Sequence, residues 1–589
     1  MTETVAGTGG IDAEVDGAHA SATQADGSGS GPRRLSLDAL FALLGRHRWL
    51  LVALVPGVLV PLIVAAATGG FSIPHNDGWA YSRIAEHFAR TGHITLLGWN
   101  RSALIGQFIL LGPLAASITT QQVYVLVLGL IGLVCVYDLL RPSLGERNAG
   151  VTALMLALWP GFGLLDTSFM TDVPAMTGMF LCLALGRRAL ERDSPALFAV
   201  AAAVGFWGTT IRAQALAAPI ALLLYAAVTH RRRTRVRLLA IAAIGVVFVV
   251  GFAVFNSWFE GLPGGDLPPY TLVPSILDTG MQTTLQTYFL VALPAAPAVF
   301  WAARPHLWRR PAIITSLVTA VIAAIALHDF GRRLFPGNYL AQDGAYAPTT
   351  VGGGDTVIFT NAEWYTLIVI ALISGSLLAG LIVHKAARAD RLVALFTLVF
   401  AAGTIGTFLL SEFMYDRYLL EILPGVLAVA LLPEPARQQQ EAAAARRFTL
   451  PRWAGVAGNW TRRGTGLVAG LVVAAVGLLL LTGALVSDRQ RWNEAEQLQA
   501  SGVPAMRIDA GLEWLGMNAP NGVTNREADP ASRPLSFFTT TPACYVVSES
   551  PRAWQYPWTQ VDLIHYQRYL VSGSAYLYVW NTHAKDCPS

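Results

Sequence analysis

Long apolar segments, separated by short polar ones, recur along nearly the whole chain. Most are close to the ~20 residues that an α-helix needs to cross ~30 Å of hydrocarbon. This pattern predicts an all-α polytopic membrane protein with about 13 transmembrane helices. The apolar segment 104–118 is shorter, and we expect an interfacial or re-entrant helix there. The expected spans are 48–68, 121–140, 149–166, 173–190, 195–211, 213–229, 238–256, 284–303, 311–328, 363–384, 391–411, 417–432 and 466–486.

Charged residues are too few for a chain of this length to fold as a soluble protein. Asp, Glu, Lys and Arg make up 13% of the 589 residues, whereas 54% are hydrophobic. Soluble domains carry roughly 25% charged residues, so lipid must cover much of the surface. The basic residues form no stripe interleaved with aromatic residues, the pattern that single-stranded nucleic acid requires. We therefore expect no nucleic-acid partner.

The arginine-rich loops determine the expected orientation in the membrane. Basic residues gather in the cytoplasmic loops of membrane proteins, which puts the N terminus on the inner side. The sequence thus predicts a multi-pass protein of the cell (cytoplasmic) membrane. The inner basic loops are 187–192, 231–237, 304–310, 385–391 and 437–463, and the outer segments are 69–120, 257–283, 329–362 and 487–589.

Three regions of the chain differ in composition. Residues 1–35 are rich in Gly, Ser, Ala and Asp; such a segment cannot bury a core, so we expect a disordered cytoplasmic tail. Residues 36–486 form the expected transmembrane domain. Residues 487–589 end in the alternating segment Ser574-Ala-Tyr-Leu-Tyr-Val-Trp580, which predicts strands. We expect a small α/β or β-rich extracytoplasmic domain there.

Two of the four cysteines lie in this C-terminal region. An oxidising compartment favours a disulfide between Cys544 and Cys587. Cys135 and Cys182 lie inside apolar segments, where a buried free thiol is the ordinary outcome. Neither pair has the spacing of a zinc site.

The first outer segment contains a short amphipathic helix. After Asp77 the apolar positions Tyr81, Ile84 and Phe88 recur at helical spacing, and Gly92 ends the pattern. Asp77 stands at the helix start, so one interpretation is an N-cap that accepts amide hydrogen bonds. The other is a general base, since a carboxylate held beside the lipid surface can take the proton of a hydroxyl.

Further acidic and basic residues are expected on the same outer side. Asp166 and Asp172 lie in the turn between two spans, where Asp172 is either a helix start before Val-Pro or a second carboxylate of a site. Arg417 lies in another outer turn and can hold a phosphate through paired hydrogen bonds. Its alternatives are snorkelling to the interface and pairing with Asp416. Arg212, between two apolar segments, also faces outward.

The location of these residues limits the chemistry. No P-loop is present, because Gly352-Gly-Gly-Asp355 lacks the required Lys and helix. The charges cluster at the outer ends of the spans, whereas secondary transporters bind substrate near the midplane. An outer-face group-transfer enzyme has no access to cytoplasmic nucleotides, so its activated donor should be attached to a lipid.

Three motifs, by their order and sidedness, resemble those of the GT-C membrane glycosyltransferases, in particular the protein O-mannosyltransferase and lipid A aminoarabinose transferase branch. They are Asp77-x-x-x-Tyr81-x-x-x-Ala85, Ser168-Phe-Met-Thr-Asp-Val-Pro174 and Asp416-Arg-Tyr-Leu-Leu-x-x-Leu-Pro424, and the similarity covers roughly residues 45–432. Two positions depart from the family pattern. Asn76 precedes Asp77 where two adjacent acids are common, and only Gly112-Pro-Leu114 remains of a Pro-Pro-Leu motif.

The resemblance implies a GT-C-like fold and an inverting sugar transfer from a polyprenyl-phosphate donor to an acceptor hydroxyl. It implies that Asp77 is the general base, with Asp172 as the next catalytic candidate, and that the Arg417 region holds the donor phosphate. The further substrate-binding candidates are Tyr81, Asp166, Arg212 and Tyr418.

The partners implied are the lipid-linked donor, a glycan, lipid or protein acceptor, and membrane lipid. No cofactor is indicated, and a divalent-metal requirement stays open. Two alternatives also stay open: transfer of a different lipid-linked group, such as a phospho-group or an oligosaccharide, and a non-catalytic transporter or scaffold for lipid-linked sugars.

Overall fold

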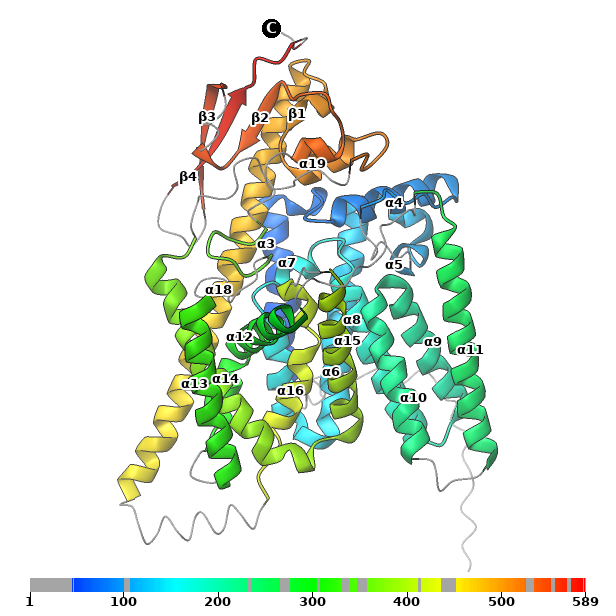
Figure 1. Cartoon of the computed structure of the whole chain (residues 1–589), viewed down its shortest axis with the longest axis vertical. Coiled ribbons are helices and arrows are strands. Elements are labelled where there is room, and N and C mark those ends of the chain that lie inside the picture. The colour runs from blue at the N-terminus through cyan, green and yellow to red at the C-terminus, as the bar shows by residue number, and fades with distance from the viewer. Residues whose placement is uncertain are drawn as a thin grey trace, which may run out of the picture. The chain divides into compact units, whose positions relative to one another are not determined.

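The computed structural model describes most of the chain from residue 47 onward (Figure 1). The expected disordered tail, residues 1–35, lies outside the described residues. The described residues are 45, 47–99, 106–229, 235–264, 276–304, 308–330, 338–346, 358–411, 415–435, 452–525, 534–551, 557–568, 574–585 and 587.

Helices dominate the structure up to residue 500. Their apolar faces pack into one large core, while other apolar side chains remain on the outside. The longer helices are α2 (Arg48–Leu54), α3 (Val60–Thr68), α4 (Gly78–Thr91), α6 (Ile118–Ala157), α8 (Asp172–Glu191), α9 (Pro195–Ile211), α10 (Ala217–Thr229), α11 (Arg235–Glu260), α12 (Ile276–Ala302), α13 (Arg310–Phe330), α14 (Asn361–Lys385), α15 (Arg391–Ser411), α16 (Ile422–Ala430) and α18 (Arg452–Ala500). Shorter elements are η1 (Val55–Leu59), η2 (Gly70–Ser72), α5 (Gly106–Ile109), η3 (Gly112–Ala116), α7 (Phe162–Asp166), η4 (Ala213–Leu216), η8 (Ala386–Arg388) and η9 (Asp416–Leu419).

Eight helices of the described chain are long and apolar enough to cross a membrane. Two of them, α11 and α13, bury only 6% and 17% of their most apolar stretch. Exposing so many Val, Ile and Leu side chains to water is energetically unfavourable, so lipid covers these faces. The chain is therefore a multi-pass membrane protein. The eight segments are Arg48–Thr68, Ile118–Ala157, Asp172–Glu191, Arg235–Glu260, Thr284–Ala302, Arg310–His328, Asn361–Arg388 and Arg463–Ala500.

The expected count of about 13 spans is not reached among the described residues. Three expected spans are helices of intermediate length, Pro195–Ile211, Ala213–Thr229 and Arg391–Thr407. Two others take different forms. The turn at Gly145 (φ 75°) in α6 separates the expected spans 121–140 and 149–166, and the second span is itself interrupted between Ala157, where α6 ends, and α7. The expected span 417–432 contains only η9 and the nine-residue α16.

A small four-stranded sheet follows α18. The strands are β1 (Ile508–Asp509), β2 (Tyr545–Ser548), β3 (Thr559–Gln567) and β4 (Ser574–Asn581), in the order β1-β2-β4-β3. Only β1 and β2 are parallel. The alternation expected at 574–580 forms β4, whose side chains alternate between exposed and buried over its first half. The remaining elements are η10 (Ala505–Arg507), α19 (Leu512–Asn518) and η11 (Pro534–Phe537).

The C-terminal region contains the expected cysteine pair. Cys544, just before β2, forms a disulfide with Cys587, with the two Cα atoms 5.6 Å apart. The expected domain boundary at residue 486 falls inside α18, which continues without interruption to Ala500. One long helix therefore links the membrane segments to the sheet (Figure 1).

Helix α4 joins the C-terminal region to the membrane helices. Its fully buried Trp79 belongs to the core of the C-terminal region and lies 5.5 Å from Phe538, ring centre to ring centre. Arg83, one turn later, donates to the carbonyl oxygens of Gly516 and Ala519 at 2.8 and 2.5 Å. Because Asp77 directly precedes α4, these contacts fix the position of that carboxylate.

The close approach of Trp79 to α19 makes Gly516 a sensitive position. A Cβ atom at Gly516 would lie 2.2 Å from the Trp79 ring, which is fully buried and cannot move aside. Gly516→Ala should therefore destabilise the protein by about 1–3 kcal/mol, the usual cost of overpacking. Thermal unfolding of the purified protein would measure this as a lower Tm.

The matched control is Gly403→Ala in α15, where nothing lies within 4 Å of an added Cβ. Ala favours a helix over Gly by about 1 kcal/mol, so this variant should unfold at the wild-type temperature or above. Equal Tm values for the two variants would contradict the docking of α4 against α19.

Candidate functional site

Asp77 is held by side chains from distant parts of the chain. Its Oδ1 accepts from Trp99 Nε1 at 2.7 Å, and its Oδ2 accepts from Arg417 Nη2 at 2.8 Å. Although Asp77 is the residue preceding α4, its side chain makes no capping hydrogen bond. The N-cap interpretation is therefore wrong for this carboxylate, which faces a charged partner instead.

The residue before Asp77 shapes the start of the helix. Asn76 has φ 55°, a left-handed conformation that Asn tolerates better than most residues. Its Oδ1 accepts the Asp77 backbone N–H at 2.7 Å, and its Nδ2 donates to Tyr339 Oη at 3.2 Å. An acid at this position could not donate that second bond while ionised, which gives a structural role to the departure from the family pattern.

Arg417 has unused hydrogen-bonding capacity. Its side chain is 6% exposed and donates to Asp77 through Nη2. Among the described residues, its Nε and Nη1 have no hydrogen-bond partner. The guanidinium carbon also lies 5.4 Å from the ring centres of Tyr415 and Tyr418. Buried donors normally have partners, so the two unpartnered N–H groups of this guanidinium are available to bind an anion.

A second ion pair lies next to the first. Arg212, at the end of α9, donates through Nη1 to Oδ1 of Asp172, the first residue of α8. The Arg212 guanidinium carbon is 4.3 Å from the ring centre of Tyr418. Tyr418 therefore contacts both arginines and connects the Asp172–Arg212 pair to the Asp77–Arg417 pair. Five of the predicted site residues, from four separate parts of the chain, form one cluster.

Asp416 holds the turn that carries Arg417. Its carboxylate accepts from the backbone N–H groups of Tyr339, Leu340 and Arg417, at 3.0, 2.6 and 2.8 Å. Burial raises the pKa of Asp416 to about 6, while these amides act in the opposite direction. The group thus stays mainly ionised at neutral pH. Pairing between Asp416 and Arg417 side chains, one of the sequence alternatives, is not what the structure contains, because the carboxylate is used by amides.

Two further predicted substrate-binding residues are buried in the helical core. Asp166, expected to face the outer aqueous side, is fully buried at the end of α7 against Gly129 of α6. Neither of its carboxylate oxygens has a hydrogen-bond partner among the described residues, so Asp166 makes no hydrogen bond to Arg417. Tyr81 is 3% exposed and packs in the core on the buried face of α4.

Several residues that the sequence analysis did not propose complete the surroundings. His75 Nδ1 lies 2.6 Å from Asp488 Oδ2 of α18, and Asp488 is also paired with Arg491. Glu513 of α19 accepts the Asn76 N–H at 3.2 Å, and burial raises its pKa. Their sequence signal is weak: His75 is a single histidine two residues before Asp77, and Asp488 and Arg491 fall in the segment 487–589 expected to form the C-terminal domain.

No described residues form a group of three or more His, Cys, Asp or Glu that could hold a metal ion.

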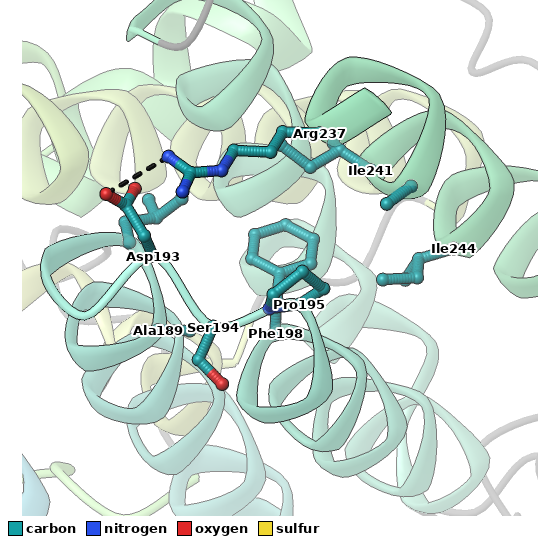
Figure 2. Close-up of a pocket in the computed structure, with 10 residues that line it drawn as sticks. Ala189, Asp193, Ser194, Pro195, Phe198, Arg237, Ile241 and Ile244 are labelled. Atoms are coloured by element: carbon teal, nitrogen blue, oxygen red, sulfur yellow. Dashed lines mark ion pairs between the residues drawn. The ribbon is translucent and has the colours of Figure 1, made fainter. Parts of the chain in front are cut away.

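A mainly apolar pocket lies at the other end of α8 (Figure 2). It has a volume of about 310 Å³, and Arg237 reaches across one side to Asp193 at 3.1 Å. Twenty residues of α8 separate its Asp172 end from this end, or about 30 Å at 1.5 Å per residue. This pocket is thus remote from the Asp172–Arg212 pair.

Residues 114–258 match a family model described as "Dolichyl-phosphate-mannose-protein mannosyltransferase". This match covers about a quarter of the chain and agrees with the resemblance to the protein O-mannosyltransferase branch. The matched segment includes Asp172 and Arg212, whereas Asp77 and Arg417 lie outside it. No curated protein matches the sequence.

Two solved structures align with almost the whole chain. A crystal structure of ArnT from Cupriavidus metallidurans in the apo state is 13% identical, with 94% of this chain and 100% of ArnT covered and a TM-score of 0.41. A second, bound to undecaprenyl phosphate, is 15% identical, with 90% and 98% covered and a TM-score of 0.41. Likenesses of this strength say nothing about individual residues.

A substitution at Asp416 tests whether its three backbone hydrogen bonds hold the turn that carries Arg417. Asp416→Asn keeps the size but puts an NH₂ group and a weaker acceptor against three N–H donors. Hydrogen bonds to charged groups contribute about 1.5–3 kcal/mol, so this variant should lower the Tm. It should also lower the affinity of the Arg417 side chain for any anion. The control is Asp562→Asn on the exposed strand β3. If both variants match wild type in Tm, Asp416 does not hold this turn.

Proposed function

We propose that the chain is a membrane glycosyltransferase that moves a sugar from a polyprenyl-phosphate donor to an acceptor hydroxyl on the outer face of the cytoplasmic membrane. In this reaction Asp77 is the general base and Arg417 holds the donor phosphate. The observation that carries the proposal is the arginine itself. It donates one N–H group to the Asp77 carboxylate and keeps two buried nitrogens unpartnered among the described residues.

The unpartnered nitrogens favour an oxyanion as their ligand. A guanidinium presents its donors in a rigid fork that matches phosphate, and leaving such donors buried without a partner is unfavourable. Arg212 is the weaker candidate, since Asp172 and Gln214 already occupy its Nη1 and Nε. Tyr418 contacts both arginines, which favours binding of one anion by the two guanidinium groups together.

The geometry also suits an inverting transfer. A guanidinium that binds Asp77 on one side and a phosphate on the other separates the two sets of oxygens by roughly 7 Å, two hydrogen bonds of about 2.8 Å plus its own width. Inverting glycosidases keep a comparable gap of about 6.5–9.5 Å between two carboxyl groups, to leave room for the nucleophile. The anomeric carbon and the attacking hydroxyl would then lie beside the guanidinium, bridging from the phosphate to Asp77.

The chemical step needs one base. Asp77 takes the proton of the acceptor hydroxyl as its oxygen bonds to the anomeric carbon, and the bond from that carbon to the phosphate oxygen breaks. The leaving polyprenyl phosphate requires no proton, and Arg417 offsets its charge. The indole N–H of Trp99 orients the carboxylate through the oxygen that Arg417 does not hold.

Asp77→Asn tests the assignment of the base. The substitution keeps the size and can still accept from Trp99, but it removes the basicity. General-base catalysis contributes about 10²–10⁴-fold, so turnover in proteoliposomes with a panel of polyprenyl-phosphate sugars should fall at least a hundredfold. Expression should be normal, and Asp562→Asn serves as the matched control. Near-normal transfer by Asp77→Asn would move the base elsewhere, with Asp172 the next candidate.

Arg417→Ala tests recognition of the donor phosphate. One charged hydrogen bond contributes about 1.5–3 kcal/mol, so polyprenyl-phosphate affinity should fall by about one to two orders of magnitude. Arg417→Lys should restore little of it, because Lys lacks the planar fork. Arg188→Ala is the control, since Arg188 pairs with Asp138 at the other end of α8. Unchanged polyprenyl-phosphate binding in Arg417→Ala would argue against phosphate recognition. If the wild-type protein moved the lipid-linked sugar across the membrane without transferring the sugar to an acceptor, a transporter would be favoured instead.

A further inference from the structure

A basic pocket lies at the ends of the membrane helices remote from Asp77. Its cations are Arg147 of α6, Arg304 just after α12, and Lys385 at the end of α14. At the other end of α6, Gln121 bonds to Ser82 of α4 at 2.6 Å, next to the Asp77 site. The residues of α6 up to Arg147 span about 40 Å at 1.5 Å per residue, close to the full thickness of a bilayer.

The charges of this pocket are not balanced. Its one acidic lining residue, Glu434, is already paired with Lys385 at 3.3 Å and with Arg388 at 3.4 Å. Lys385 also donates to the carbonyl oxygens of Ala430 and Leu432, both at 2.8 Å. In the described part of the chain, Arg147 and Arg304 have no acidic partner. Two positive charges therefore remain for an external anion.

Tryptophan rings hold one of these arginines in place. The Arg147 guanidinium carbon lies 4.8 Å from the Trp301 ring centre and 5.5 Å from the Trp49 ring centre. Arg463 also lies 5.9 Å from Trp301. A stacked guanidinium keeps its N–H groups available at its edge, and tryptophan is typical of the membrane–water interface. Trp301 is 37% exposed, so the pocket borders the lipid-facing surface.

We propose that this pocket binds the phosphate headgroup of an anionic phospholipid in the leaflet remote from Asp77. Positive-inside orientation makes this the cytoplasmic leaflet. Arg147 and Arg304 bind the phosphate, Trp49 and Trp301 fix Arg147, and Lys385 is retained to neutralise Glu434. Basic pockets between transmembrane helices on the cytoplasmic side recognise such headgroups. The pocket of Figure 2 is a useful contrast, since its single arginine is paired with Asp193.

Native mass spectrometry of the delipidated full-length chain tests this proposal with dioleoylphosphatidylglycerol and dioleoylphosphatidylcholine. Wild type should retain phosphatidylglycerol in preference to phosphatidylcholine. Arg147→Gln/Arg304→Gln should weaken phosphatidylglycerol binding at least about tenfold, given the usual strength of charged hydrogen bonds. The matched control is Arg310→Gln at the exposed start of α13, which should bind like wild type.

Two further measurements keep the result decisive. Should the double variant unfold, Arg304→Gln alone replaces it, because Arg304 makes none of the ring contacts of Arg147. Inorganic phosphate at equal concentration should not displace the lipid. Equal binding of the two lipids by wild type, or unchanged binding by the arginine variants, would overturn the proposal, and displacement by inorganic phosphate would instead indicate a free-anion site.

Discussion

The segments that form the candidate site meet at one buried ion pair, Asp77–Arg417, between residues 340 positions apart. Removing two charges from water costs several kcal/mol per ion, and such a pair persists only when further hydrogen bonds and good geometry offset that cost. Here Trp99 supplies a hydrogen bond to the acid, and two tyrosine rings lie close to the arginine. Every segment that supplies one of these groups must therefore meet at one point.

The neighbouring contacts are arranged to meet that requirement. Asp416 ties the turn of Arg417 to the backbone at Tyr339, and Tyr339 in turn accepts from Asn76, next to Asp77. The C-terminal region contributes from the other side, because Trp79 and Arg83 of α4 pack against α19. The C-terminal region is thus part of the site's support, and the contact of α19 with α4 restricts movement of the Asp77 carboxylate.

Charged side chains are paired differently at the two ends of the helices. Near Asp77, acids and arginines are buried in a network in which Arg417 and Arg491 each keep two donors without a partner among the described residues. At the other end some charges are paired locally, as in Arg187–Asp390 at 2.7 Å, whereas Arg147 and Arg304 have no acidic partner among the described residues. The first arrangement suits a reacting group that must be kept from water. The second suits attachment to an anionic membrane surface.

The sequence alone determined the membrane character, the amphipathic helix that ends at Gly92, the strand at 574–580 and the order of the motifs that carry the GT-C resemblance. These features depend on local periodicity and composition, which need no knowledge of distant contacts. Sequence spacing could not distinguish a capping Asp77 from a paired one, or separate buried Asp166 from Asp172 in the same turn. Nor could it find Trp99, Glu513 or the Asp488–His75 contact. Tertiary packing decided these, because the free energy of a buried charge depends on which partners the fold brings within hydrogen-bonding distance.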